Sequence, residues 1–179
     1  LKLHDIPNTV GKAIESLKDL PIDYLTVHVS GGEKMLQTAK ERQEEFLPQT
    51  RLLGVTYLTG LSTHEFSSLW GIQTEEEKKQ GFFRLLNVAK AGKLNSIVLS
   101  PQELHWTSEW EKEQLSSSEE PFFKVCPGIR FQEQIDRGET QDQSRVSSPE
   151  SAINQGANLL VMGRSLTQND SVPQSFWEK

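Results

Sequence analysis

A lysine and an aspartate stand three residues apart at the start of the chain, in the stretch LKLHDIPNTV. A lysine beside carboxylates stays protonated, so Lys2 could deliver a proton to a carbanion. A carboxylate such as Asp5, held near a substrate carboxylate, repels it, and loss of carbon dioxide relieves that repulsion. The same spacing also fits a surface ion pair near a chain end.

A second set of residues could bind a phosphate group. The segments PGIR and MGRS each follow an apolar run, and they contain Arg130 and Arg164. Guanidinium groups bind phosphate through paired hydrogen bonds, and Gly163 offers a backbone N–H. Gln143, in the long polar loop 131–145, could fold over the ligand. A pair of ordinary loop arginines is the competing interpretation.

Other chemistries have weaker support in the sequence. The four histidines, His4, His28, His64 and His105, lack the spacing of a zinc site. His4 and His28 are better explained as buried or interface residues that form hydrogen bonds. The chain has no G-x-S-x-G element and neither glycine-rich nucleotide fingerprint. Cys126, in the apolar run FFKVCPGI, is expected to be a core residue rather than a reactive thiol.

Length and composition predict one domain over residues 1–179. The net charge of -6 argues against nonspecific binding to nucleic acid or to an anionic membrane. With one cysteine the chain cannot form an internal disulfide, which fits a reducing compartment. No apolar run approaches the ~18 residues of a membrane span, and no signal-peptide pattern is present, so a cytoplasmic location is expected.

Short aliphatic and β-branched runs alternate with amphipathic patterns. Strands are expected at 23–30, 51–58, 95–100, 122–129 and 157–163, and the opening LKLHDI is a sixth. Helices are expected at 8–20, 32–46 and 75–91, the last ending at Gly92. Two more helix starts are expected where Ser100 and Ser148 precede prolines.

This alternation predicts an α/β fold with a parallel sheet, either an open doubly wound sheet or a closed barrel. In a parallel barrel the active site lies at the carboxyl ends of the strands. The polar residues expected at those ends are Lys2, His4, Asp5, His28, Ser30, Thr59, Arg130, Gly163 and Arg164. A closed barrel of this type needs eight strands, whereas the pattern supplies six.

Several motifs together resemble one family. LKLHDIPNTV closely resembles the signature of the orotidine 5'-phosphate decarboxylase family, which is Asp-x-Lys-x-x-Asp with HDIPNT following. VTYLTGLS resembles the family's VTxLTS strand, and LSPQE resembles its xSxQE element. The region from VCPGIR to VMGRSLTQ is similar to the family's closing region, in the same order. The resemblance implies a TIM (β/α)8 barrel, of which about six βα units are present.

The resemblance also implies roles for residues near the reacting carbon. Lys2 would protonate C6 of the pyrimidine after carbon dioxide leaves. Asp5 would be the second aspartate of an Asp-Lys-Asp array and would reach into the neighbouring subunit's site. Thr9 would do likewise and touch the ribose side. Thr59 would contact the pyrimidine, with Ser62 as the alternative.

The phosphate would be held by Arg130, Gln143, Gly163 and Arg164. The loop between Arg130 and Gln143 is longer than the commonest bacterial form, which leaves Gln141 as an alternative. The family implies the substrate orotidine 5'-phosphate, the product uridine 5'-phosphate, no metal and no organic cofactor. It also implies a homodimer with shared active sites.

Two departures from the family pattern leave alternatives open. The first aspartate of the array and two strands would precede Leu1, so we expect the chain to be the C-terminal portion of a longer protein. A magnesium-dependent sugar-phosphate decarboxylase or aldolase of the same superfamily would share the array but lack HDIPNT followed by PGIR. A non-catalytic barrel remnant that binds nucleotides through the phosphate grip is the third possibility.

Overall fold

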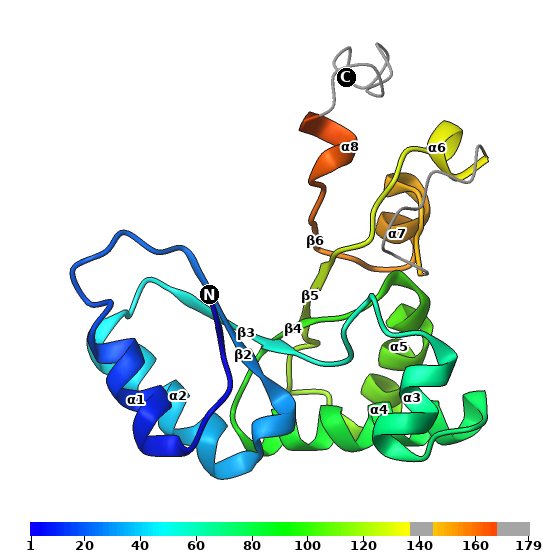
Figure 1. Ribbon diagram of the computed structural model, residues 1–179. Coiled ribbons are helices and arrows are strands. Elements are labelled where there is room, and N and C mark those ends of the chain that lie inside the picture. The colour runs from blue at the N-terminus through cyan, green and yellow to red at the C-terminus, as the bar shows by residue number, and fades with distance from the viewer. Residues whose placement is uncertain (137–144, 168–179) are drawn as a thin grey trace.

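The computed structural model describes residues 1–136 and 145–167, and its centre is a parallel sheet (Figure 1). Six strands pair in sequence order: β1 (Lys2–Leu3), β2 (Tyr24–His28), β3 (Arg51–Val55), β4 (Ser96–Val98), β5 (Phe123–Cys126) and β6 (Leu159–Leu160). The six expected strands are confirmed, and each is shorter than the range predicted for it. Because every pair is parallel, all six carboxyl ends lie along the same edge of the sheet.

Helices connect the strands. The bounds are α1 (Pro7–Glu15), η1 (Val29–Gly31), α2 (Glu33–Phe46), α3 (Thr63–Trp70), α4 (Glu75–Ala91), η2 (Pro101–Glu103), α5 (Leu104–Gln114), α6 (Gln132–Asp136), α7 (Pro149–Asn154) and α8 (Arg164–Thr167). In Figure 1, α1 and α2 pack together on the left, and α4 packs against α5 on the right. The three expected helices are confirmed as α1, α2 and α4, and Gly92 is the C-cap of α4.

The two expected serine caps are also confirmed. Ser100 Oγ accepts a hydrogen bond from the Gln102 N–H, although the first turn there is a 3₁₀ helix. Ser148 Oγ accepts a hydrogen bond from the Ser151 N–H at the start of α7. In both cases the side-chain oxygen satisfies one of the backbone donors that a helix start leaves unpaired.

Helix α3 is not among the expected helices. It begins with a capping box, in which Ser62 Oγ accepts from the Glu65 N–H and the Glu65 carboxylate accepts from the Ser62 N–H. The pattern Ser-x-x-Glu in STHE is the sequence signal for such a start. This helix matters for the site because its first residues follow the loop after β3.

Aliphatic and aromatic side chains fill the space between sheet and helices. Ile14, Leu36, Phe82, Leu86 and Ile97 are all fully buried. Cys126 is buried too, and burial raises the pKa of its thiol to about 12, so the core interpretation of this cysteine is confirmed. Within the described residues, no helix combines the length and apolar character needed to cross a membrane.

Candidate active site

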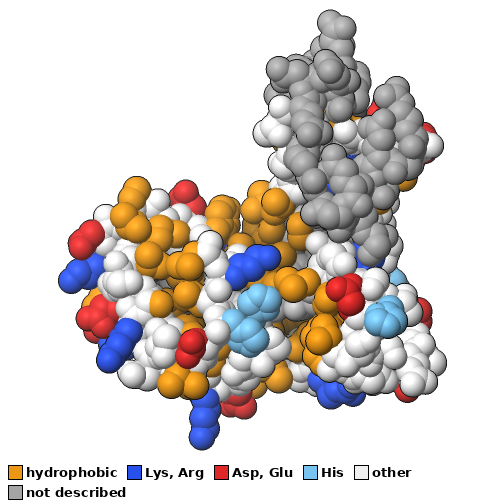
Figure 2. All heavy atoms as spheres, viewed as in Figure 1, with side chains coloured by type: hydrophobic (Ala, Val, Ile, Leu, Met, Phe, Trp, Pro, Cys, Tyr) orange, Lys and Arg blue, Asp and Glu red, His pale blue; other side chains and the backbone are white. Residues whose placement is uncertain are grey.

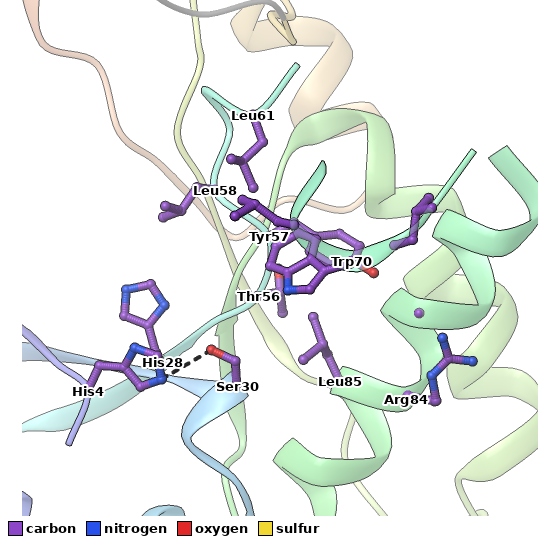
Figure 3. Close-up of a pocket in the computed structure, with 13 residues that line it drawn as sticks. His4, His28, Ser30, Thr56, Tyr57, Leu58, Leu61, Trp70, Arg84 and Leu85 are labelled. Carbon is purple, nitrogen blue, oxygen red and sulfur yellow. Dashed lines mark hydrogen bonds between the residues drawn. The ribbon is translucent and has the colours of Figure 1, made fainter. Parts of the chain in front are cut away.

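A cavity of about 510 Å³ opens at the carboxyl ends of β1, β2 and β3 (Figure 3). His4 follows β1, His28 ends β2, and Thr56 follows β3. Helices α3 and α4 close the other side with Trp70 and Leu85. The cavity therefore lies at the edge of the sheet where parallel barrels carry their ligands.

Two histidines form one wall of this cavity. The rings of His4 and His28 stack with their centres 4.9 Å apart, and Ser30 Oγ lies 3.4 Å from His4 Nε2 in a hydrogen bond (Figure 3). The pKa of His28 is lowered by burial, and then by the nearby positive charges of His4 and Lys2. Both effects favour the neutral form of His28. Among the described residues, no group of three or more His, Cys, Asp or Glu side chains could hold a metal ion.

Lys2 is the first residue of the two-residue strand β1, and Asp5 lies just beyond its carboxyl end. Lys2 pairs with Thr26 of β2, and Thr26 Oγ1 donates a hydrogen bond to the Leu1 carbonyl at 2.5 Å. Asp5 Oδ1 accepts a hydrogen bond from the Ile6 N–H at 2.7 Å. Both side chains are exposed, and no ion pair joins them in the described part of the chain. The surface ion pair that the spacing allowed is therefore not present.

The other expected residues near the reacting end occupy the same edge. Thr9 is exposed on the first turns of α1. Thr59 lies in the turn after β3 and is half-buried. Ser62 caps α3, so its hydroxyl is already hydrogen-bonded to Glu65. This engagement makes Thr59 the more available of the two hydroxyls.

The expected phosphate ligands follow β5 and β6. Arg130 is buried, and its Nη1 donates to the Ile129 carbonyl at 2.9 Å. Gly163 is exposed, and its carbonyl accepts from the Leu166 N–H where α8 begins at Arg164. Gln143 and its alternative Gln141 lie outside the described residues.

A buried ion pair in this region was not predicted from the sequence. Arg145 Nη1 donates to Glu103 Oε1, and Glu103 Oε2 accepts from the Ser100 N–H at 2.9 Å. Burial raises the pKa of Glu103, and the Arg145 guanidinium opposes that rise. The motif LSPQE indicates only the capping role of Glu103. A separation of 42 residues leaves no sequence signal for its pairing with Arg145.

Comparison with known proteins identifies relatives along the whole chain. The family described as "Orotidine 5'-phosphate decarboxylase / HUMPS family" matches residues 1–178. Orotidine 5'-phosphate decarboxylase of Staphylococcus aureus (strain Newman) is 38% identical over 177 residues, which cover 98% of this chain and 71% of that protein. The same enzyme from strain Mu3 has the same identity and coverage.

Solved structures share the fold. The crystal structure of orotidine 5'-phosphate decarboxylase from Lactobacillus acidophilus superposes with a TM-score of 0.71 at 27% identity, over 99% of this chain and 70% of that one. An uncharacterized conserved protein from Geobacillus kaustophilus gives a TM-score of 0.70 at 26% identity, over 94% of this chain and 66% of that one. The six strands are therefore part of a TIM barrel, as expected.

The lowered pKa of His28 predicts a specific pH dependence of stability. The unfolded chain takes up a proton at His28 near pH 6.5, whereas the folded chain resists it. Acidification below about pH 6.5 should therefore lower the free energy of unfolding, down to the folded pKa. Urea unfolding at about pH 7.5 and about pH 5.5 measures the loss.

The variant His28→Gln should lose less stability on acidification than the wild type, because it removes the titrating group. His64→Gln is the matched control, since His64 is exposed on α3. An equal loss in His28→Gln and wild type would contradict the assignment.

Proposed function

Because the chain belongs to the orotidine 5'-phosphate decarboxylase / HUMPS family, we propose that its protein converts orotidine 5'-phosphate to uridine 5'-phosphate and carbon dioxide. This reaction is a step of de novo pyrimidine synthesis. The observation that carries the proposal is the 38% identity to named decarboxylases over nearly the whole chain. We further propose that residues 1–179 belong to one barrel domain and that the enzyme works in the cytoplasm, which cell fractionation can test.

Lys2 is the proposed proton donor. In the reaction the bond between C6 and the carboxylate breaks, the electron pair stays on C6, and the ammonium of Lys2 supplies the proton. Its place in β1, near enough to His28 in the cavity wall to lower the pKa of that histidine, supports this role. The chemistry is a proton transfer after loss of carbon dioxide, and we propose that it requires neither a metal nor an organic cofactor.

Asp5 is proposed to reach into the neighbouring subunit's site, where its carboxylate would lie near that of the substrate. Its Oδ1 is held by the Ile6 N–H, so the carboxylate stays beside the strand end. Repulsion between this carboxylate and that of the substrate would be relieved when carbon dioxide leaves. Thr9, exposed on α1, would contact the ribose side, and Thr59 would contact the pyrimidine.

The phosphate end of the ligand is proposed to bind beside Arg130, Gly163 and Arg164, with Gln143 folding over it. Support comes from the topology, since these residues follow the adjacent parallel strands β5 and β6. Phosphate sites after the last two strands are common in TIM barrels. Binding energy at this remote group can be used to position the reacting carbon.

We propose that two copies of the chain form a homodimer through the surface at this same edge of the sheet. Leu58, Leu69 and Trp70 line the cavity and are exposed, as is Ile6 next to Asp5. Figure 2 shows exposed hydrophobic side chains around a central group of histidines on this face. An apolar surface of this kind, beside residues that would serve a neighbouring site, fits an interface between two copies.

The first test is decarboxylation of orotidine 5'-phosphate by the purified full protein without added metal, followed by ultraviolet absorbance. The wild type should turn over. Lys2→Ala should abolish turnover because the proton donor is gone, while binding of uridine 5'-phosphate stays measurable by calorimetry.

Lys18→Ala is the matched control, because Lys18 is an exposed lysine beyond the end of α1. It should keep wild-type turnover. Turnover retained in Lys2→Ala would remove Lys2 from the proposed role, and an inactive wild type would refute the decarboxylase.

Arg164→Ala should weaken binding of uridine 5'-phosphate by about 1.5–3 kcal/mol, the range for hydrogen bonds to charged groups. Uridine, which lacks the phosphate, should bind equally well to variant and wild type. Arg42→Ala is the control, since Arg42 pairs with Glu45 on the surface of α2. An unchanged affinity for the nucleotide would exclude Arg164 from the phosphate site.

Leu69→Lys should shift the protein from dimer to monomer in sedimentation, because it places a charge in the proposed interface. Leu69 is 63% exposed. Ile153→Lys is the control, since Ile153 is an exposed residue of α7. Equal dimerisation of both variants would contradict this interface.

A further inference from the structure

Arg145 joins separate segments at the carboxyl edge of the sheet. Its side chain is 6% exposed, and its Nη1 donates to the carboxylate of Glu103. Its Nη2 donates to the Leu58 carbonyl at 2.6 Å, and the guanidinium lies 5.5 Å from the centre of the Phe66 ring. Charge-assisted hydrogen bonds away from water are strong and directional. The planar guanidinium of Arg145 therefore fixes the Leu58 carbonyl relative to Glu103.

The carboxylate of Glu103, which accepts the hydrogen bond from Arg145, is itself held in place. Its side chain has no exposed surface, and its second oxygen accepts from the Ser100 N–H at 2.9 Å. Ser100 lies at the end of the segment that follows β4, and η2 begins at the next residue. Glu103 is therefore held within the segment that directly follows β4.

Backbone hydrogen bonds join Ser147, close to Arg145 in sequence, to the segment PGIR. The Ser147 N–H donates to the Gly128 carbonyl at 3.1 Å, and the Arg130 N–H donates to the Ser147 carbonyl at 3.0 Å. Ile129 and Ser147 form a parallel bridge. Arg145 lies two residues before Ser147, so a displacement of PGIR would carry Arg145 with it.

These contacts connect the two ends of the proposed ligand site. Thr59 directly follows Leu58, and Arg130 ends the segment that is fastened to Ser147. We propose that Arg145 is a positioning residue, which holds the Thr59 loop at a fixed separation from the phosphate-binding segment. A phosphate bound beside Arg130 then helps to place the pyrimidine contact. This inference rests on the proposed function for the identity of the two ends.

Two variants separate this role from a merely structural one. Arg145→Lys keeps a positive charge beside Glu103, but an ammonium lacks the planar fork that reaches the carboxylate and the Leu58 carbonyl together. The double variant Arg145→Met with Glu103→Gln removes both charges, so it leaves no bare buried carboxylate. After Glu103→Gln, the amide oxygen of the new side chain can still accept from the Ser100 N–H.

A second buried ion pair provides the matched control. Lys124 Nζ lies 2.9 Å from Glu111 Oε2, with side chains 8% and 10% exposed. Glu111 Oε1 also accepts a backbone hydrogen bond, from the Phe122 N–H. This pair joins β5 to α5 without contacting the loop after β3. The control is Lys124→Met with Glu111→Gln.

The measurement is the ratio of the affinities of the full protein for uridine 5'-phosphate and uridine, by calorimetry, with thermal unfolding in parallel. Both Arg145 variants should lower the ratio by about tenfold or more, because a displaced phosphate-binding segment would lose at least one charge-assisted hydrogen bond to the phosphate. The control should keep the ratio within about twofold, because it lies outside the contact network. Where the wild type decarboxylates orotidine 5'-phosphate, kcat should fall with the ratio.

An unchanged ratio in both Arg145 variants would overturn the inference, and so would an equal fall in the control. A wild type that binds the nucleotide no better than the nucleoside would overturn it as well. A wild type without decarboxylase activity would refute the proposed function alone. The ratio would then still decide whether Arg145 couples the two segments.

Discussion

Parallel pairing of neighbouring strands sets the position of every candidate residue in this chain. Residues that are far apart in sequence, such as Asp5, Thr59 and Arg130, follow strands that pair in sequence order. The register of β2 against β3 runs over five residue pairs, from Tyr24–Arg51 to His28–Val55. Since parallel strands have their carboxyl ends at the same edge of the sheet, the loops that follow meet there, and the chemistry of the site can be built from several loops.

The sequence predicts the helices and strands better than the side-chain contacts between them. Apolar runs located five of the strands, because a strand covered on both faces needs continuous apolar residues, and the strand-like opening LKLHDI located the sixth. Helix α3 was missed although Ser62 and Glu65 carry its capping signal, because its short apolar face is a weak pattern. Arg145 and Glu103 come from different loops, and nothing in their local patterns distinguishes them from surface charges. The catalytic roles came from motif resemblance, while the structure supplies only the places of those residues.

Electrostatics at the strand ends favour a site for an anionic ligand. The neutral form of His28 is favoured, in part because Lys2 is close enough to disfavour a second positive charge. The ammonium of Lys2 is near this wall of the cavity, and no ion pair in the described residues gives it a carboxylate partner. In the proposed reaction, this cation attracts the substrate carboxylate and serves as the acid once carbon dioxide has left.

A buried ion pair stabilises a loop only at a large cost in desolvation free energy. Two charges lose several kcal/mol each on leaving water, and well-packed apolar side chains of similar volume often stabilise a protein as much. The pair of Arg145 and Glu103 therefore gives little stability for its desolvation cost. Apolar side chains cannot provide directional hydrogen bonds. The rigid guanidinium of Arg145 bonds both the Leu58 carbonyl and the Glu103 carboxylate. Defined geometry between loops is what a site with two distant binding ends requires, because small misplacements of bound groups slow the reaction strongly.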